Sequence, residues 1–181
     1  PIGYNVDGTG PMLLPMPAIC VAVNVCRPEA RGHLSLRSAD PLALPVINHL
    51  MFSAQSDLDT LRAGAQLGRK MLRSKAFAGV VRQELKPSAD VDSAEDWNAF
   101  LRASAMRFSH PVGTCRIGLD GSAVVDPLLR VHGVQGLSVA DASVMPFLPS
   151  ANTNAAALMI GEKAADLLRD GLQRRKKEMA Q

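Results

Sequence analysis

Aromatic residues, cysteines and long apolar runs are scarce in this chain of 181 residues. One Trp and one Tyr leave no series of rings on which nucleic-acid bases could stack. The cysteines, Cys20, Cys26 and Cys115, form no C-x-x-C pair, which argues against a disulfide framework or a zinc site. No apolar run is long enough to span a membrane. These absences favour a globular protein of a reducing compartment, and we expect it to be cytoplasmic.

The net charge of +3 does not point to nucleic acid either. Four consecutive basic residues at 174–177 lie in the C-terminal tail, and the rest of the chain is slightly negative. Basic side chains near the end of a helix are favoured by the helix dipole and are usually solvated. We therefore expect no nucleic-acid partner.

A glycine-rich turn for binding phosphate is also missing. The G-x-G at residues 8–10 is followed by Leu13, where a dinucleotide-binding turn needs a third glycine. Three prolines between residues 11 and 17 disfavour the helix that should follow. We therefore expect residues 1–18 to form a loop, and we expect the chain to lack a nucleotide-binding domain. The chain also begins without Met, so we expect a fragment or one chain of a split enzyme.

Apolar and polar residues alternate over residues 19–26, which predicts a strand. A polar turn follows, and Leu34 and Leu36 then alternate with polar residues. Together these segments predict an antiparallel hairpin. A short apolar strand is also predicted at residues 137–140, running into Asp141.

Two helices are predicted from capping patterns, and a third from its periodicity. Ser56 with Asp59, and Ser93 with Asp96, resemble capping boxes at helix starts. A helix is expected from Ala155 to about residue 173. Because strands and helices do not alternate regularly, the fold class expected is α+β.

His110 is the best candidate for acid–base chemistry. Pro111 holds it extended, and Gly113 allows a tight bend just after it. Histidine titrates near neutral pH and can take a proton from a hydroxyl. Read alone, a single histidine before proline is more often structural. The other histidines lie on a strand or in loops and show no metal-ligand spacing, so no metal site is expected.

Three blocks carry a resemblance to a known family: HPVGTCRIG from His110, VVDPLLRVHGVQGLSVADASVMP, and SANTNAAALMIGEKAAD. They resemble the C-terminal part of glucose–methanol–choline (GMC) oxidoreductases, which pass a hydride from an alcohol to FAD. The resemblance implies that residues 1–118 are part of a substrate domain, an antiparallel sheet backed by helices. It implies that residues 119–181 are the strand–helix segment that completes an FAD-binding domain.

The resemblance also implies roles for residues. His110 would be the catalytic base, and Asn152 would orient the substrate hydroxyl opposite it. Asn152, Thr153 and Asn154 could instead simply cap the helix, and Asp141 could merely end a strand. The residues implied to contact FAD are Asp141, Ala142, Asn152, Thr153 and Asn154.

We therefore expect the C-terminal fragment or chain of an FAD-dependent, choline dehydrogenase-like alcohol dehydrogenase or oxidase. Its partners would be a small alcohol and an N-terminal FAD-binding chain or segment, without which the chain should bind FAD weakly or not at all. One alternative is an FAD-containing hydroxynitrile lyase-like enzyme. Another is a non-catalytic binding module on the same scaffold.

Overall fold

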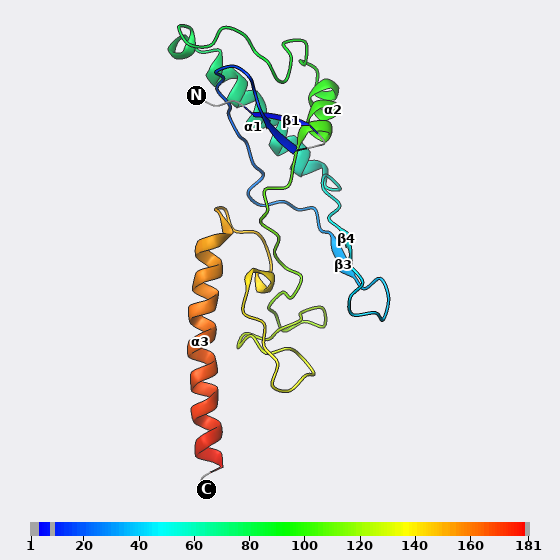
Figure 1. Ribbon diagram of the computed structural model, residues 1–181, viewed down its shortest axis with the longest axis vertical. Helices are drawn as coiled ribbons and strands as arrows, with labels where there is room; N and C mark the ends of the chain where they lie inside the picture. The colour runs from blue at the N-terminus through cyan, green and yellow to red at the C-terminus, as the bar shows by residue number, and fades with distance from the viewer. Residues whose placement is uncertain (1–3, 8–9, 180–181) are drawn as a thin grey trace. The chain divides into compact units, whose positions relative to one another are not determined.

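The computed structural model describes residues 4–7 and 10–179, and helices make up most of the regular secondary structure in this part of the chain. Its α-helices are α1 (Gln55–Leu72), α2 (Ala94–Ser104) and α3 (Thr153–Glu178). Two short 3-10 helices are η1 (Lys75–Phe77) and η2 (Ala142–Val144). The helix expected from Ala155 is confirmed as α3, the long helix of Figure 1, which begins two residues earlier and extends further.

The predicted α+β fold is confirmed in part: the helices are present, but the described residues contain little of the antiparallel sheet that was expected to be backed by them. The strands are β1 (Tyr4–Asp7), β2 (Gly10–Leu13), β3 (His33–Ser35) and β4 (Val46–Asn48). They form two separate two-stranded sheets, β1 with β2 and β3 with β4. Strands of three or four residues offer few ladder hydrogen bonds and little face on which helices could pack.

The loop predicted for residues 1–18 is also wrong in part, because β1 and β2 form an antiparallel hairpin. Its register pairs Tyr4 with Leu13 and Asp7 with Gly10. Pro11 is compatible with β2 because a strand with one neighbour has a free edge, where no N–H is needed. A hairpin of this kind is not the strand–turn–helix that binds a dinucleotide.

The chain divides into two compact units. The first unit is Pro1–Gly32 with Asn48–Arg107, and the second is His33–Ile47 with Phe108–Gln181. In the first unit α2 packs against α1 and contacts β1.

The predicted strand at residues 19–26 is not a strand but lies against α1. Among the described residues its backbone makes no hydrogen bond to another backbone group. A Cβ at Gly64 would lie 2.8 Å from Val23 Cγ1, and one at Gly68 would lie 3.2 Å from Val21 Cγ1. The two glycines, one turn apart on α1, therefore allow this close approach. Val21 and Val23 therefore pack on a helix, and β3 pairs with β4 instead of with this segment.

One of the two predicted capping boxes is confirmed. Ser93 caps α2, with its Oγ accepting from the Asp96 N–H at 3.1 Å and the Asp96 carboxylate accepting from the Ser93 N–H at 3.3 Å. The box at Ser56 is wrong, because α1 starts before it and its N-cap residue is Ala54, without a side-chain cap. Ser56 instead donates to Glu29 Oε2 at 2.7 Å.

A buried carboxylate beside Ser56 connects α1 to the preceding loop. Asp57 is 5% exposed and accepts from the backbone N–H groups of Glu29 and Ala30 at 2.8 and 3.0 Å. Two such bonds compensate a carboxylate for its lost hydration.

The apolar core of the first unit contains Leu58 and Trp97, which are each 1% exposed. The Arg69 guanidinium lies over the Trp97 ring, 4.3 Å from its centroid.

The core of the second unit forms where one face of α3 packs on irregular chain. Ala156, Ile160, Ala164 and Leu167 recur at helical spacing along that face. The strand predicted at 137–140 is absent: the Val139 N–H donates to the Leu129 carbonyl at 3.0 Å, but the pairing does not extend into a ladder. The other side chains of this core are Val112, Ile117, Val124, Val125, Leu129, Val131, Val139, Ala142, Val144 and Met145.

Candidate functional site

The loop that carries His110 has two residues in the left-handed backbone region. Ser109 has φ +57° and Gly113 has φ +89°. The Gly113 position supports the predicted bend, because only glycine adopts such a conformation without strain. A Cβ there would also lie 3.4 Å from the Met145 carbonyl oxygen. The half-buried His110 is therefore presented from a loop whose path is set on both sides.

The structure brings His110 together with the turn that begins α3. His110 Nε2 lies 3.3 Å from Asn152 Oδ1, although the residues are 42 apart in sequence. His110 Nδ1 lies 3.1 Å from Thr153 Oγ1. The Phe108 ring contacts the imidazole edge-on, with centroids 5.7 Å apart. Both ring nitrogens thus have a partner within the second unit.

The first turn of α3 can interact favourably with a negatively charged group. The first turn of an α-helix has N–H groups without intrahelical partners and a partial positive charge. No acidic residue lies in this turn to offset that charge. Asn152 and Asn154 are exposed and add side-chain amides. This set of donors fits the electron-rich edge of a flavin ring, so Asn152, Thr153 and Asn154 could hold that part of the cofactor.

Asp141 caps η2, with Oδ1 accepting from the Ser143 N–H at 2.8 Å. The neighbouring Ser143 hydroxyl and this N–H together lower the pKa of the Asp141 carboxyl. Of these two groups, only the Ser143 N–H makes a hydrogen bond to the Asp141 carboxylate. The buried Ser143 Oγ lies nearby but has no hydrogen-bond partner within the described residues. Ala142 packs against the core of the second unit. Asp141 is exposed and Ala142 is held beside it, so both can line a cofactor edge as well as end a turn.

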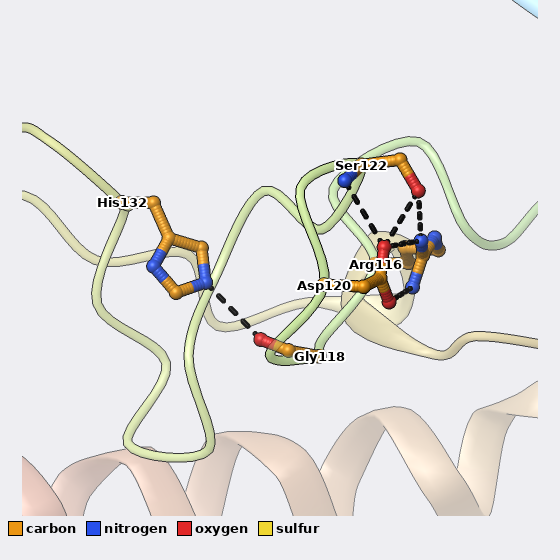
Figure 2. A network of polar contacts seen from close by, with 5 residues as sticks. All are labelled: Arg116, Gly118, Asp120, Ser122 and His132. Carbon is orange, nitrogen blue, oxygen red and sulfur yellow. Dashed lines mark hydrogen bonds and ion pairs between the residues drawn. The ribbon is translucent and has the colours of Figure 1, made fainter.

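His132, the nearest competitor of His110 in sequence, has a structural contact. Its Nε2 lies 3.1 Å from the Gly118 carbonyl oxygen and donates to it. In the same loop Arg116 pairs with Asp120 at 3.0 Å and contacts Ser122, and Figure 2 shows both contacts with the His132 bond. The Arg116 hydrogen bonds, followed by those from Ser122, hold the pKa of Asp120 far below its usual range. These contacts close the loop.

The remaining histidines and Cys115 do not contact His110 in any hydrogen bond or ring contact of the described residues. His33 is exposed in β3, and His49 Nδ1 accepts from the Met51 N–H at 3.2 Å. Cys115 is half-buried with a free thiol. Over residues 4–7 and 10–179, no three His, Cys, Asp or Glu side chains gather as metal ligands would. In the same part of the chain, every helix is too short or too polar to cross a membrane.

Sequence reasoning did not find two of the contacts at this site. Thr153 was expected to contact a cofactor or cap α3, whereas its hydroxyl lies against the His110 ring. The Phe108 contact was not expected at all. The Thr153 contact has no sequence signal, because it spans 43 residues and depends on how the loops pack against α3.

Comparison with known proteins gives consistent matches. A family model described as GMC oxidoreductase matches residues 28–161. The alcohol dehydrogenase [acceptor] of Pseudomonas putida is 40% identical over 141 residues, 78% of this chain and 26% of its own length. Human mitochondrial choline dehydrogenase is 41% identical over 151 residues, 82% of this chain and 25% of its own.

Solved structures agree with these matches. A structure of formate oxidase from Aspergillus oryzae RIB40, from work on its FAD modification, superposes with a TM-score of 0.71. It is 34% identical, and the match covers 80% of this chain and 25% of that one. The chain thus spans about a quarter of the length of the curated relatives it matches first.

Proposed function

Because the chain belongs to the GMC oxidoreductase family, whose members bind FAD, we propose that it is the C-terminal part of an FAD-dependent alcohol dehydrogenase or oxidase related to choline dehydrogenases. The substrate class is a small alcohol. When bound, FAD supplies the acceptor for the hydride that leaves the alcohol carbon. The chain's own residues bind and orient the alcohol and take its proton.

The observation that carries this proposal is the pairing of His110 with Asn152 across 3.3 Å. An alcohol oxygen lying to one side of this pair, within reach of both side chains, could donate its proton to His110 Nε2 while hydrogen-bonding the Asn152 amide. Neutral imidazole is a suitable base near neutral pH. Asn152 carries no charge, so its contribution is to hold the reacting oxygen in one orientation.

The start of α3 gives the site its electrostatic component. The N–H groups of the first turn of a helix lack intrahelical partners and carry partial positive charge, and in α3 this turn lies beside Asn152. Donors fixed where negative charge develops stabilise a transition state without having to reorganise. In this proposal Asn152, Thr153 and Asn154 would contact the flavin ring from one side, and Asp141 with Ala142 would contact it at the end of η2.

The surface of α3 supports a further polypeptide as partner. Leu158, Leu168 and Leu172 are between 55% and 65% exposed on α3, outside the set of side chains that packs on the core of the second unit. Exposed leucines on a helix that already buries another face are suited to contact a further apolar surface. We assign that surface to the FAD-binding part of a GMC enzyme, which would also supply the phosphate-binding turn. Without that part, the chain should bind FAD weakly or not at all.

The test is anaerobic mixing of the complete flavoenzyme, this chain together with its FAD-binding part, with choline and with simple primary alcohols. Loss of the oxidised flavin absorbance with one of them supports alcohol oxidation. Flavin that stays oxidised in the presence of every alcohol, while a cyanohydrin is cleaved, would replace the oxidoreductase with a lyase. If no alcohol reduces the flavin and no cyanohydrin is cleaved, only a binding role would remain.

A further inference from the structure

Each ring nitrogen of His110 contacts one of two consecutive residues. Nε2 faces Asn152 on the exposed side of the ring, and Nδ1 faces the half-buried Thr153 hydroxyl. We propose that Thr153 is a positioning residue that holds His110 in the Nδ1–H tautomer and leaves the Nε2 lone pair for the substrate. This inference rests on the proposed role of His110 as the base.

The tautomer decides whether His110 can act at all. Neutral imidazole has one N–H and one lone pair, and the hydrogen bond made by one nitrogen sets the state of the other. In the proposed function the alcohol binds at Nε2, the ring nitrogen that faces Asn152. If Thr153 donated its hydroxyl proton to Nδ1, then Nε2 would carry the hydrogen and could not accept another. With Thr153 Oγ1 as acceptor at 3.1 Å, Nδ1 keeps its hydrogen and Nε2 is free to act as a base.

Asn152 is compatible with this state. A side-chain amide presents either its oxygen or, turned over, its NH₂ group from the same position. Oδ1 is the atom 3.3 Å from Nε2, and it accepts from the protonated ring formed after proton transfer. Toward an unprotonated Nε2 the amide turns over and its NH₂ group donates until the alcohol replaces it as the donor to Nε2. Asn152 can therefore partner Nε2 before and after the step. Selection of the tautomer falls to Thr153.

Thr153 is held well enough for this task. It is the first residue of α3, and a β-branched side chain has few χ1 rotamers. The helix is fixed to the core of the second unit through Ala156 and Ile160, within its first two turns. The His110 loop is fixed in turn by the backbone at Ser109 and Gly113. Two fixed elements thus place Oγ1 against Nδ1.

The tautomer can be measured on the 181-residue chain without FAD or alcohol. Long-range ¹H–¹⁵N correlation spectra distinguish a protonated from an unprotonated ring nitrogen, at a pH well above the ordinary histidine pKa of about 6.5. A His110→Gln chain identifies the His110 signals among those of the four histidines. We expect mainly Nδ1–H in the wild-type chain, whereas imidazole free in water prefers Nε2–H. A wild-type ring that is mainly Nε2–H overturns the proposal.

Two variants separate the hydroxyl from the shape of the side chain. Thr153→Val keeps the branching and removes the hydroxyl, so the ratio of Nδ1–H to Nε2–H should fall by roughly three- to tenfold, the scale of one lost hydrogen bond. Thr153→Ser keeps the hydroxyl and should retain the wild-type ratio. An unchanged ratio in Thr153→Val would show that another group sets the tautomer.

The tautomer and the proposed function can fail separately. Mainly Nδ1–H in the chain, together with a complete enzyme whose flavin no alcohol reduces, would leave the role of Thr153 intact and remove the alcohol chemistry. Normal flavin reduction together with a mainly Nε2–H ring would support the alcohol chemistry and remove the proposed role of Thr153.

Discussion

The two units of this chain bury their side chains in different ways. The first unit packs two helices around Leu58 and Trp97, and it covers α1 with a segment whose backbone has no backbone partner among the described residues. The second unit packs a single helix on crossing loops, and those loops bring His110 to the start of that helix. The comparison teaches that the site residues depend on loop packing, while the more regular helical unit carries none of them.

Trp97→Ala should have the largest effect on stability. A side chain that is 1% exposed leaves a large cavity, and the expected loss is about 3–5 kcal/mol. The Arg69 guanidinium would also lose the ring beneath it. Hydrogen exchange measured by segment should show protection lost in α1 and α2, with Trp97→Phe much milder. An equal loss of protection in α3 would contradict the division into two units.

Ile160→Ala should do the same to the second unit. Ile160 is 8% exposed, so its truncation should cost about 2–5 kcal/mol and should weaken protection in α3. It should also broaden or shift the His110 ring signals, since the helix start would lose its anchor. The matched control is Leu158→Ala on the same helix, which is 65% exposed and should change stability by less than about 0.5 kcal/mol in the isolated chain. Equal effects of the two changes would show that the wrong face of α3 has been assigned to the core.

Ser93→Ala should have a smaller effect, confined to the first unit. It removes the bond from the Asp96 N–H to the Ser93 hydroxyl, leaves the bond donated by the backbone N–H of residue 93, and should cost about 1 kcal/mol. Ser56→Ala removes a bond to an exposed Glu29 side chain and should cost less. The chain has a single Trp, in α2, so its fluorescence during urea unfolding reports on this unit. A larger loss from Ser56→Ala would contradict a start of α1 at Gln55, ahead of Ser56.

Acid should weaken the second unit by the smallest of these effects. Burial raises the pKa of Asp126, but the bonds from Arg130 and Leu128 outweigh it, so the pKa of Asp126 lies below its ordinary value. A group whose pKa is depressed by folding contributes stability above its unfolded pKa of about 3.9 and loses it as pH falls through the folded value. Stability of α3, followed by circular dichroism, should therefore decline below about pH 4. Asp126→Asn should reduce that decline without removing it, because the pKa values of Asp120 and Asp141 in the same unit are also lowered. An unchanged slope would assign the whole decline to those other groups.

Local signals predicted the parts of the fold that depend on neighbouring residues. The capping box of Ser93 and Asp96 needs only one turn of helix, and α3 needs only its own periodicity. The strand predicted at 19–26 failed because a period-two pattern specifies which side chains are buried and not what covers them. The segment is covered by α1, which it approaches at Gly64 and Gly68, and nothing in the sequence of the segment itself indicates this contact. The Ser56 box failed because Asp57 and Ser56 bind the loop at Glu29 instead.

The site shows the same limit. The motif at His110 and the asparagines before α3 could be singled out from sequence, and the structure brings His110 and Asn152 within 3.3 Å. Which ring nitrogen faces which partner could not be predicted. That depends on the left-handed backbone at Ser109 and on the packing of α3, both of which are tertiary properties.

The most direct test of the account is the rate of alcohol-dependent flavin reduction in the complete enzyme, measured for single histidine variants. His110→Ala should lower that rate by roughly two to four orders of magnitude, because it removes the proton acceptor. Asn152→Ala should lower it less, and His132→Ala, which loses only the bond to Gly118, should leave it within a few-fold. Equal losses for His132→Ala and His110→Ala, or an unchanged rate for His110→Ala with flavin still bound, would contradict the assignment of His110 as the base.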